Sequence, residues 1–335
     1  MKLPKASQKL VVFGGGTGLS NLLRGLIQFN QPSMITAVPS GWDDGGSSGR
    51  LRDEMGTLPP GDARQCLLAC MESAEQKEVA QKLFDDRLAD IEGPFKGHSV
   101  GNLITARLER LFAGQDRGLE AARKLFRVQV NILPATLTDL RLIARTQGGL
   151  EIQGETNIDN RRLRKDFNPK DPIVRIFFNT QAKANQEVVK KILEAQKIIF
   201  SAGDLYTSIL PHLLIEGVQE AIAKSKAKVI LVLNLMTKRG ETDFYKASNH
   251  LESFLDYLVD HNRLDVMIAS SNDLNPKVLK IYHEDGQEPV EIDRDRCLEI
   301  VPSIKIIQKP LAKYLNNAHL LRHDSKLLAK TILSL

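Results

Sequence analysis

VVFGGGTGLS, residues 11–20, is the stretch that decides the fold of this chain. An apolar strand runs directly into a glycine cluster, and residues 19–29 follow with helical periodicity. In such a turn, unpaired backbone N–H groups and the positive end of the helix face one point, where glycines let an anion approach. The stretch therefore predicts a phosphate-binding strand–turn–helix unit, with a tight turn that binds nothing as the alternative. Leu19 stands where the dinucleotide fingerprint has its third glycine, which argues against a nicotinamide oxidoreductase.

Short apolar runs alternate with longer helical segments along the rest of the chain. This order predicts an α/β protein with a Rossmann-like, doubly wound, mostly parallel sheet. Strand signals stop between residues 66 and 125, so we expect a helical lobe inserted into one large domain spanning residues 1–335. Residues 148–171 predict an antiparallel excursion. The expected strands are residues 9–13, 34–38, 128–133, 173–178, 197–200, 229–233 and 266–269.

Composition fits a folded globule, with 42% hydrophobic and 26% charged residues. No apolar run reaches membrane-spanning length and the first ten residues do not form a signal peptide, so we expect a cytoplasmic protein. The three cysteines fit reduced thiols, and core packing explains Cys66 and Cys70 better than a metal pair. A net charge of +5 without a basic block, together with 5% aromatic residues, argues against nucleic acid as a partner.

WDDGGSSGR, residues 42–50, follows the second predicted strand. Two carboxylates, two hydroxyls and three glycines pack poorly in a core, so the loop indicates a site beside the first turn. Asp43 or Asp44 could hold a ribose hydroxyl or a magnesium ion, while Ser47, Ser48 and the glycine amides could hold phosphate. A solvated loop of ordinary turn residues is the alternative.

Residues 97–101 read GHSVG, the pattern of a hydrolase nucleophile elbow. That motif needs a buried strand before it, whereas residues 89–96 are polar and interrupted by proline. We therefore reject a serine hydrolase. His98, Ser99 and Asn102 are expected to begin a helix that faces the ligand, with capping as the alternative role of His98.

Two more predicted strands end in polar loops, FSAGDLYTS at residues 200–208 and NLMTKRGET at residues 234–242. Several such loops at one edge of a sheet indicate a shared cleft. Asp62 is expected to cap the start of another helix. Arg322 and Lys326, four residues apart, could grip a phosphate or form a solvated helix face.

In this order, the motifs resemble the gluconeogenesis factor family of the 2-phospho-L-lactate transferase superfamily, from Val11 to about Lys326. The resemblance implies a Rossmann-like core and a cytoplasmic bacterial protein that binds a UDP-sugar such as UDP-N-acetylglucosamine, with a role in carbon metabolism and cell shape. The alternative is a transferase of the 2-phospho-L-lactate type that acts on a nucleotide-activated donor with magnesium. The sequence shows no evident pair of a nucleophile and a general base, which favours a binding protein over an enzyme. Phosphoryl-type transfer can nevertheless proceed by positioning and charge neutralisation alone.

Two positions depart from the family pattern. Trp42 replaces a small residue, and SAGD at residues 201–204 replaces the usual GPGS. Because a carboxylate at Asp204 would repel a phosphate there, we expect pyrophosphate on the first two loops and expect Asp204 to accept hydrogen bonds from backbone amides or a ligand hydroxyl. The sequence leaves open whether the chain forms a homo-oligomer. The expected ligand-binding residues are Gly14, Gly15, Gly16, Thr17, Gly18, Leu19, Asp43, Asp44, Gly45, Gly46, Ser47, Ser48, His98, Asn102, Gly203, Asp204, Leu205, Tyr206, Thr207, Asn234, Met236, Thr237 and Arg322, with Asp43 and Asp44 as magnesium ligands.

Overall fold

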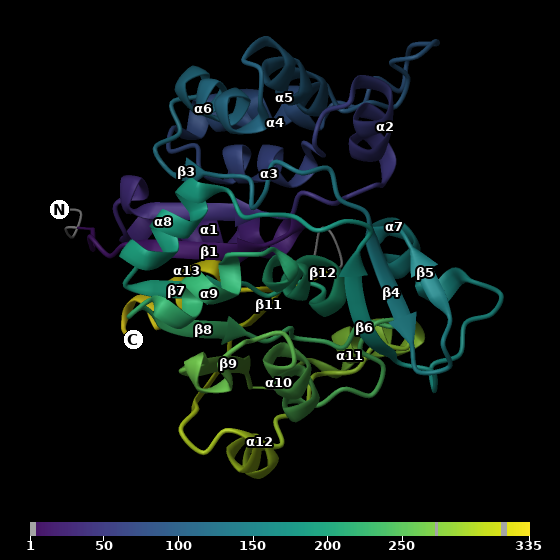
Figure 1. Cartoon of the computed structure of the whole chain (residues 1–335), viewed down its shortest axis with the longest axis vertical. Coiled ribbons are helices and arrows are strands. Elements are labelled where there is room, and N and C mark those ends of the chain that lie inside the picture. Colours follow the sequence, from purple (N-terminus) through teal and green to yellow (C-terminus); the bar gives the residue numbers. More distant parts are fainter. Residues whose placement is uncertain (1–4, 272–273, 316–319) are drawn as a thin grey trace.

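A parallel sheet of seven strands forms the centre of the computed structural model, which describes residues 5–271, 274–315 and 320–335 (Figure 1). The strand order is β10-β9-β8-β7-β1-β2-β3. From β1 the chain winds through β2 to β3 at one edge, then crosses back to β7 on the other side of β1 and winds through β8 and β9 to β10, which confirms the predicted doubly wound fold. The strands are β1 Leu10–Gly14, β2 Ile35–Pro39, β3 Asn131–Ile132, β7 Lys197–Phe200, β8 Lys228–Val232, β9 Val266–Ser270 and β10 Lys305–Lys309.

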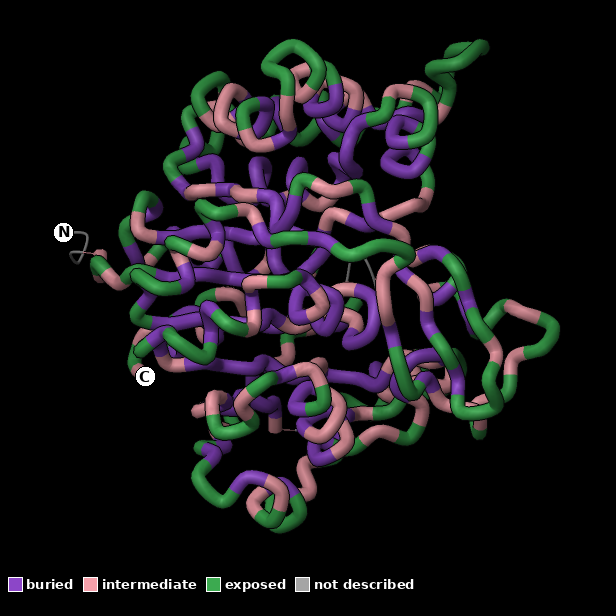
Figure 2. Tube along the Cα trace, in the orientation of Figure 1, coloured by how far each residue is buried: buried purple, intermediate pink, exposed green. Residues whose placement is uncertain are grey.

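Helices cover both faces of this sheet because successive strand side chains point to opposite sides. Val12 lies in the apolar cluster shared with α1 and α13, whereas Val11 lies in the cluster shared with α8, α9 and α10. The inner strands β1, β2, β7, β8 and β9 are buried along nearly their whole length, whereas the edge strand β10 is mostly exposed (Figure 2). The helices are α1 Gly16–Phe29, α8 Gln186–Glu194, α9 Val218–Lys224, α10 Ala247–Leu255, α11 Pro276–Glu284, α12 Arg294–Ile300 and α13 Ser325–Leu333.

The helical lobe lies between β2 and β3, at the top of Figure 1. It consists of α2 Gly46–Met55, α3 Gly61–Ala69, α4 Ala74–Asp85, α5 Val100–Leu111 and α6 Gln115–Leu125. The predicted lobe of residues 66–125 therefore omitted α2 and most of α3. Cys66 and Cys70 are buried as free thiols in the apolar cluster between α3 and the sheet, as core packing predicted.

A separate sheet of three antiparallel strands lies beside the central one, in the order β5-β4-β6 (Figure 1). Its strands are β4 Leu142–Thr146, β5 Glu151–Gln153 and β6 Ile173–Phe178, and α7 Glu155–Asp159 follows β5. The predicted excursion is thus present. Residues 173–178 were expected to form another buried strand. They form β6 instead, which pairs with β4 in this small sheet and buries only Ile173 and Ile176.

Two further segments border the site described below. Residues 205–224 form three short helical pieces, a π-helix at Leu205–Ile209, a 3-10 helix at Leu210–Leu214 and then α9. Pro211 lies near the first division and has no N–H to donate to a helix. The hairpin of β11 Ala312–Leu315 and β12 Leu320–His323 precedes α13. None of the helices in the three described ranges is long and apolar enough to cross a bilayer.

Candidate functional site

A cleft of about 620 Å³ opens at the carboxyl edge of the central sheet. Its walls come from the loops after β1, β2, β7 and β8, from α7 and α11, and from the β11–β12 hairpin. Open α/β sheets bind ligands outside the carboxyl ends of their strands at the point where the strand order reverses, which here lies between β1 and β7. The cleft therefore occupies the position at which this fold class binds ligands.

The glycine turn after β1 forms one side of the cleft. Gly16 begins α1 with φ of +50°, in the left-handed region that favours glycine. A Cβ atom on Gly18 would lie 1.7 Å from the carbonyl oxygen of Ala202, so the start of α1 packs directly on the loop after β7. The first N–H groups of a helix have no intrahelical partner, and that of Gly16 donates to the carboxylate of Asp62.

Two half-buried carboxyl groups, those of Asp43 and Asp62, lie beside this turn. Burial and then the charge of Asp43 raise the pKa of Asp62 to about 7, and burial also raises the pKa of Asp43. The Ser40 hydroxyl is buried and has no hydrogen-bond partner among the described residues. A Cβ atom on Gly15 would stand 2.7 Å from Ser40 Oγ and 2.9 Å from Asp62 Oδ2, so oxygen atoms converge here. Asp62 does not cap α3, whose N-cap is Pro60, and serves the glycine turn instead.

Asp44, the neighbour of Asp43, is turned away from the cleft. Its Oδ1 accepts a hydrogen bond from the backbone N–H of Thr156 at 2.8 Å. That N–H belongs to the first turn of α7, where a carboxylate is electrostatically favoured. The structure therefore separates the two carboxylates that the sequence offered as one magnesium site.

The two serines of the second loop lie behind the cleft wall, in the first turn of α2. Ser47 Oγ lies within hydrogen-bonding distance, 3.1 Å, of Nδ1 of His98, and burial lowers the pKa of that histidine. Asn102 Nδ2 donates to Ser48 Oγ at 3.4 Å. His98 and Asn102 thus bind α2 rather than line the cleft.

Ser99, the serine of the GHSVG pattern, caps α5. Its Oγ accepts from the N–H of Asn102 at 3.3 Å and donates to the carbonyl of Phe84 at 2.6 Å. A turn precedes it where a nucleophile elbow needs a strand. With its proton donated to a carbonyl, Ser99 has no base that would activate it.

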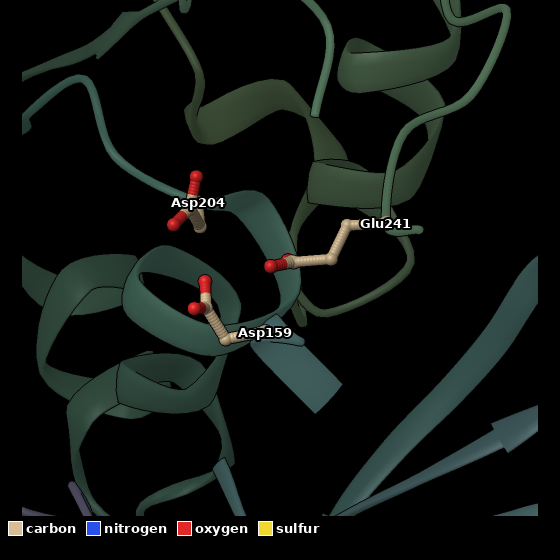
Figure 3. A group of neighbouring side chains, drawn as sticks. All are labelled: Asp159, Asp204 and Glu241. Atoms are coloured by element: carbon tan, nitrogen blue, oxygen red, sulfur yellow. The ribbon is translucent and has the colours of Figure 1, made fainter. Parts of the chain in front are cut away.

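Three acidic side chains meet where α7 and the loops after β7 and β8 come together. Asp159, Asp204 and Glu241 point toward one another (Figure 3), and Lys238 Nζ lies 2.7 Å from Asp159 and 3.3 Å from Asp204. Burial lowers the pKa of Lys238, but the charges of Asp204 and Glu241 outweigh it and raise that pKa, so Lys238 stays cationic. Asp204 was expected to accept hydrogen bonds from backbone amides or a ligand hydroxyl. Its carboxylate caps no helix and pairs with Lys238, while the contact with a ligand hydroxyl stays a prediction.

Protein oxygens already occupy the amides at the start of the π-helix. Glu241 accepts from the N–H of Tyr206 at 3.2 Å and from Thr207 Oγ1 at 3.3 Å, and Asn234 Oδ1 accepts from the N–H of Gly203 at 2.9 Å. A phosphate at this turn would have to displace these groups. The sequence did not reveal that Glu241 would occupy these groups.

The side of the cleft beyond β8 is more apolar. Tyr282 of α11 accepts from the N–H of Leu321 at 2.7 Å through its hydroxyl, and Leu235 and Met236 pack with Leu321 in one small cluster. Arg322 lies next to them on β12. This wall is separated from the Asp43 side by β7 and β1, so the cleft is acidic at one end and apolar at the other.

About half of the expected ligand-binding residues line the cleft. Trp42 also reaches it, but the ring is almost wholly buried, donates to the carbonyl of Thr207 at 2.7 Å and packs against His212. Expected residues that line the cleft are Gly15, Gly16, Thr17, Gly18, Asp43, Gly203, Asp204, Thr207, Asn234, Met236, Thr237 and Arg322. Expected residues outside the lining are Gly14, Leu19, Asp44, Gly45, Gly46, Ser47, Ser48, His98, Asn102, Leu205 and Tyr206.

A glycine turn and half-buried carboxyl groups lie together at the switch point of a doubly wound sheet, the position at which α/β proteins of this class bind ligands. Residues 10–312 match the sequence model of the family described as 2-phospho-L-lactate transferase CofD, and the chain belongs to this family. Within it, the chain is 33% identical over 328 residues to the gluconeogenesis factor of Bacillus subtilis, with 98% of both chains covered. It is 36% identical over 292 residues to the gluconeogenesis factor of Halalkalibacterium halodurans, covering 86% of this chain and 85% of the relative.

A crystal structure supports the same assignment. A member of the UPF0052 family from Bacillus halodurans superposes with a TM-score of 0.88 and 33% identity, covering 98% of this chain and 100% of the other. The resemblance drawn from the motifs is confirmed, and the chain is a member of the gluconeogenesis factor family.

Proposed function

We propose that this chain binds a nucleotide-sugar, a UDP-sugar such as UDP-N-acetylglucosamine, and acts in the cytoplasm in carbon metabolism and cell-shape control. The observation that carries the proposal is that a glycine turn, a pair of half-buried carboxyl groups and an apolar wall share one cleft at the switch point. In a nucleotide-sugar the diphosphate joins the nucleoside to the sugar, so such a ligand needs an anion site with an apolar surface for the base and polar groups for the hydroxyls nearby.

The diphosphate belongs on the glycine turn, where the N–H groups of Thr17 and Gly18 open α1. Asp204 and Lys238 present a carboxylate and an ammonium group for sugar hydroxyls. The base then lies against Tyr282, on the apolar side. This arrangement keeps the anionic part of the ligand nearest to the helix end that favours it.

A magnesium ion fits the acidic side of this cleft. A diphosphate beside Asp43 and Asp62 meets like charges, and Mg²⁺ prefers carboxylate and phosphate oxygens. The unpartnered hydroxyl of Ser40 adds a further oxygen beside Asp62. Asp43 and Asp62, rather than Asp44, would therefore hold the ion, which would neutralise the charge of the diphosphate.

The ligand can be identified by thermal unfolding with a panel of nucleotides and nucleotide-sugars. A ligand that binds only the folded state raises the melting temperature, and at about one hundred times its Kd it adds about 2.7 kcal/mol. We expect UDP-N-acetylglucosamine with Mg²⁺ to give a clear rise and the sugar alone to give none. A panel in which no nucleotide derivative changes the melting temperature would contradict the proposal.

Asp43→Asn and Asp44→Asn form a matched pair that tests the magnesium assignment. Asp43 lines the cleft and Asp44 holds α7, so only Asp43→Asn should abolish the contribution of Mg²⁺ to nucleotide affinity. Asp44→Asn should cost roughly 0.3 to 1 kcal/mol of stability through the lost negative charge at the start of α7 while keeping the response to Mg²⁺. Calorimetric titrations with and without Mg²⁺ measure both effects, and loss of the response in Asp44→Asn alone would reverse the assignment.

A second candidate is a transferase of the 2-phospho-L-lactate type, which the family match favours. Such a transfer can proceed by positioning and charge neutralisation, and Asp43 and Asp62 supply sites for the cation it would use. The test is incubation with a guanylated phospholactate donor, a deazaflavin acceptor and Mg²⁺. Release of the nucleotide, lost in Asp43→Asn, would establish this candidate over binding alone.

A further inference from the structure

The start of α5 carries a motif that the cleft does not use. Residues 97–102 read GHSVGN, and both His98 and Asn102 are buried against α2. Helix α2 begins only a few residues after Asp43. Contacts between α5 and α2 can therefore determine how Asp43 enters the cleft.

A chain of hydrogen bonds leads from α5 to Asp43. Asn102 Nδ2 donates to Ser48 Oγ at 3.4 Å, and the Ser48 hydroxyl donates to the Asp43 carboxylate. Asp43 Oδ1 also accepts from the N–H of Gly45 at 2.9 Å. The Nδ2 group of Asn102 only donates and an ionised carboxylate only accepts, so the Ser48 hydroxyl between them accepts from Asn102 and donates to Asp43.

The atoms in this chain are tightly confined at the start of α3. A Cβ atom on Gly61 would lie 2.6 Å from Ser48 Oγ and 3.2 Å from Asp43 Oδ2. Only glycine at position 61 leaves room for the Ser48 hydroxyl and the Asp43 carboxylate. The start of α3 therefore packs against both groups.

The adjacent serine is equally buried but belongs to a different network. Ser47 and Ser48 are each only 4% exposed. Ser47 Oγ accepts from the N–H of Ser99 at 3.2 Å and faces Nδ1 of His98, and it makes no recorded contact with Asp43. Two neighbouring hydroxyls of the same helix turn thus serve as each other's control.

We propose that Ser48, held in turn by Asn102, is a positioning residue that fixes the Asp43 carboxylate for a divalent cation. This inference rests on the cation-binding part of the proposed function. Hydrogen-bond donors behind a ligating carboxylate orient it, and removing such a donor lowers metal affinity. The helical lobe would then set the geometry of the cleft through the start of α5.

The test compares Ser48→Ala with Ser47→Ala. The melting temperature is titrated with Mg²⁺ alone and with Mg²⁺ at saturating UDP-N-acetylglucosamine. We expect the Mg²⁺ midpoint of Ser48→Ala to rise roughly tenfold while that of Ser47→Ala stays near wild type. At saturating Mg²⁺, the nucleotide affinity of Ser48→Ala should return to the wild-type value, which a general loosening of the fold would not allow.

The outcomes separate the two proposals. Equal midpoints for Ser47→Ala and Ser48→Ala, or a wild-type protein that does not respond to Mg²⁺, would overturn the positioning role. A wild-type response to Mg²⁺ alone without any response to the nucleotide-sugar would refute the proposed ligand and leave the positioning role supported. If Ser48→Ala fails to fold, Asn102→Ala carries the test, with a smaller rise of the Mg²⁺ midpoint expected because it breaks the chain one step earlier.

Discussion

Replacing Gly18 with alanine is expected to destabilise the fold by about 3 kcal/mol and to abolish nucleotide binding. The new Cβ atom would lie 1.7 Å from the carbonyl oxygen and 2.8 Å from the carbonyl carbon of Ala202. Both are backbone atoms, which cannot rotate away as a side chain can. Helix α1 would have to move off the loop after β7, and the cleft between these two elements would lose its shape.

Gly41→Ala is the control for this substitution. No atom lies within 4 Å of the Cβ position at Gly41, so its stability should stay within the range of an ordinary surface change, about 0.5 kcal/mol. Urea unfolding of both variants gives the free-energy difference, and calorimetry gives nucleotide affinity. A Gly18→Ala protein as stable as Gly41→Ala would mean that α1 does not pack on this loop as described.

The central sheet could be predicted from the sequence because its strands carry strong local signals. The run that ends at Phe13 is apolar throughout and precedes a glycine cluster, and the structure places it at the centre of the sheet. Residues 173–178 carry a similar apolar signal but form an antiparallel strand outside that sheet. Amino-acid composition cannot distinguish a strand of the central sheet from a strand of the small sheet. The difference lies in which neighbouring strand is available for pairing in the folded protein.

The candidate site was only partly predictable for a related reason. The glycine turn and the loops after β7 and β8 follow strands, so the fold alone brings them to one edge. Glu155 and Asp159 come from α7, which approaches the cleft through contacts such as Asp44 with Thr156, 112 positions apart in the chain. No local pattern marks such residues. Trp42 is the opposite case, a residue that the sequence marked but that serves mainly in packing. It departs from the family pattern beside the predicted site, yet its ring is buried and packs against His212.

The half-buried carboxyl groups of the cleft predict an unusual dependence of stability on pH. Burial, and then the charge of Asp43, raise the pKa of Glu155 to about 9, and Asp62 is raised to about 7. In the unfolded chain, a glutamate loses its proton near its ordinary pKa of 4.5. Between these values the folded state binds more protons than the unfolded state, so stability falls as the pH rises.

Glu155→Gln should remove much of this loss, since glutamine resembles the protonated carboxyl group at every pH. We expect the variant to exceed wild type in stability by about 2 to 4 kcal/mol near pH 8 and to match it near pH 4. A smaller decline between pH 4 and pH 7 should persist in the variant because of Asp62. Urea unfolding across this pH range measures the difference, with Glu284→Gln on the exposed face of α11 as the control. A difference between Glu155→Gln and wild type that does not change with pH would show that Glu155 is ionised in the folded protein, and the electrostatic description of the cleft would have to be revised.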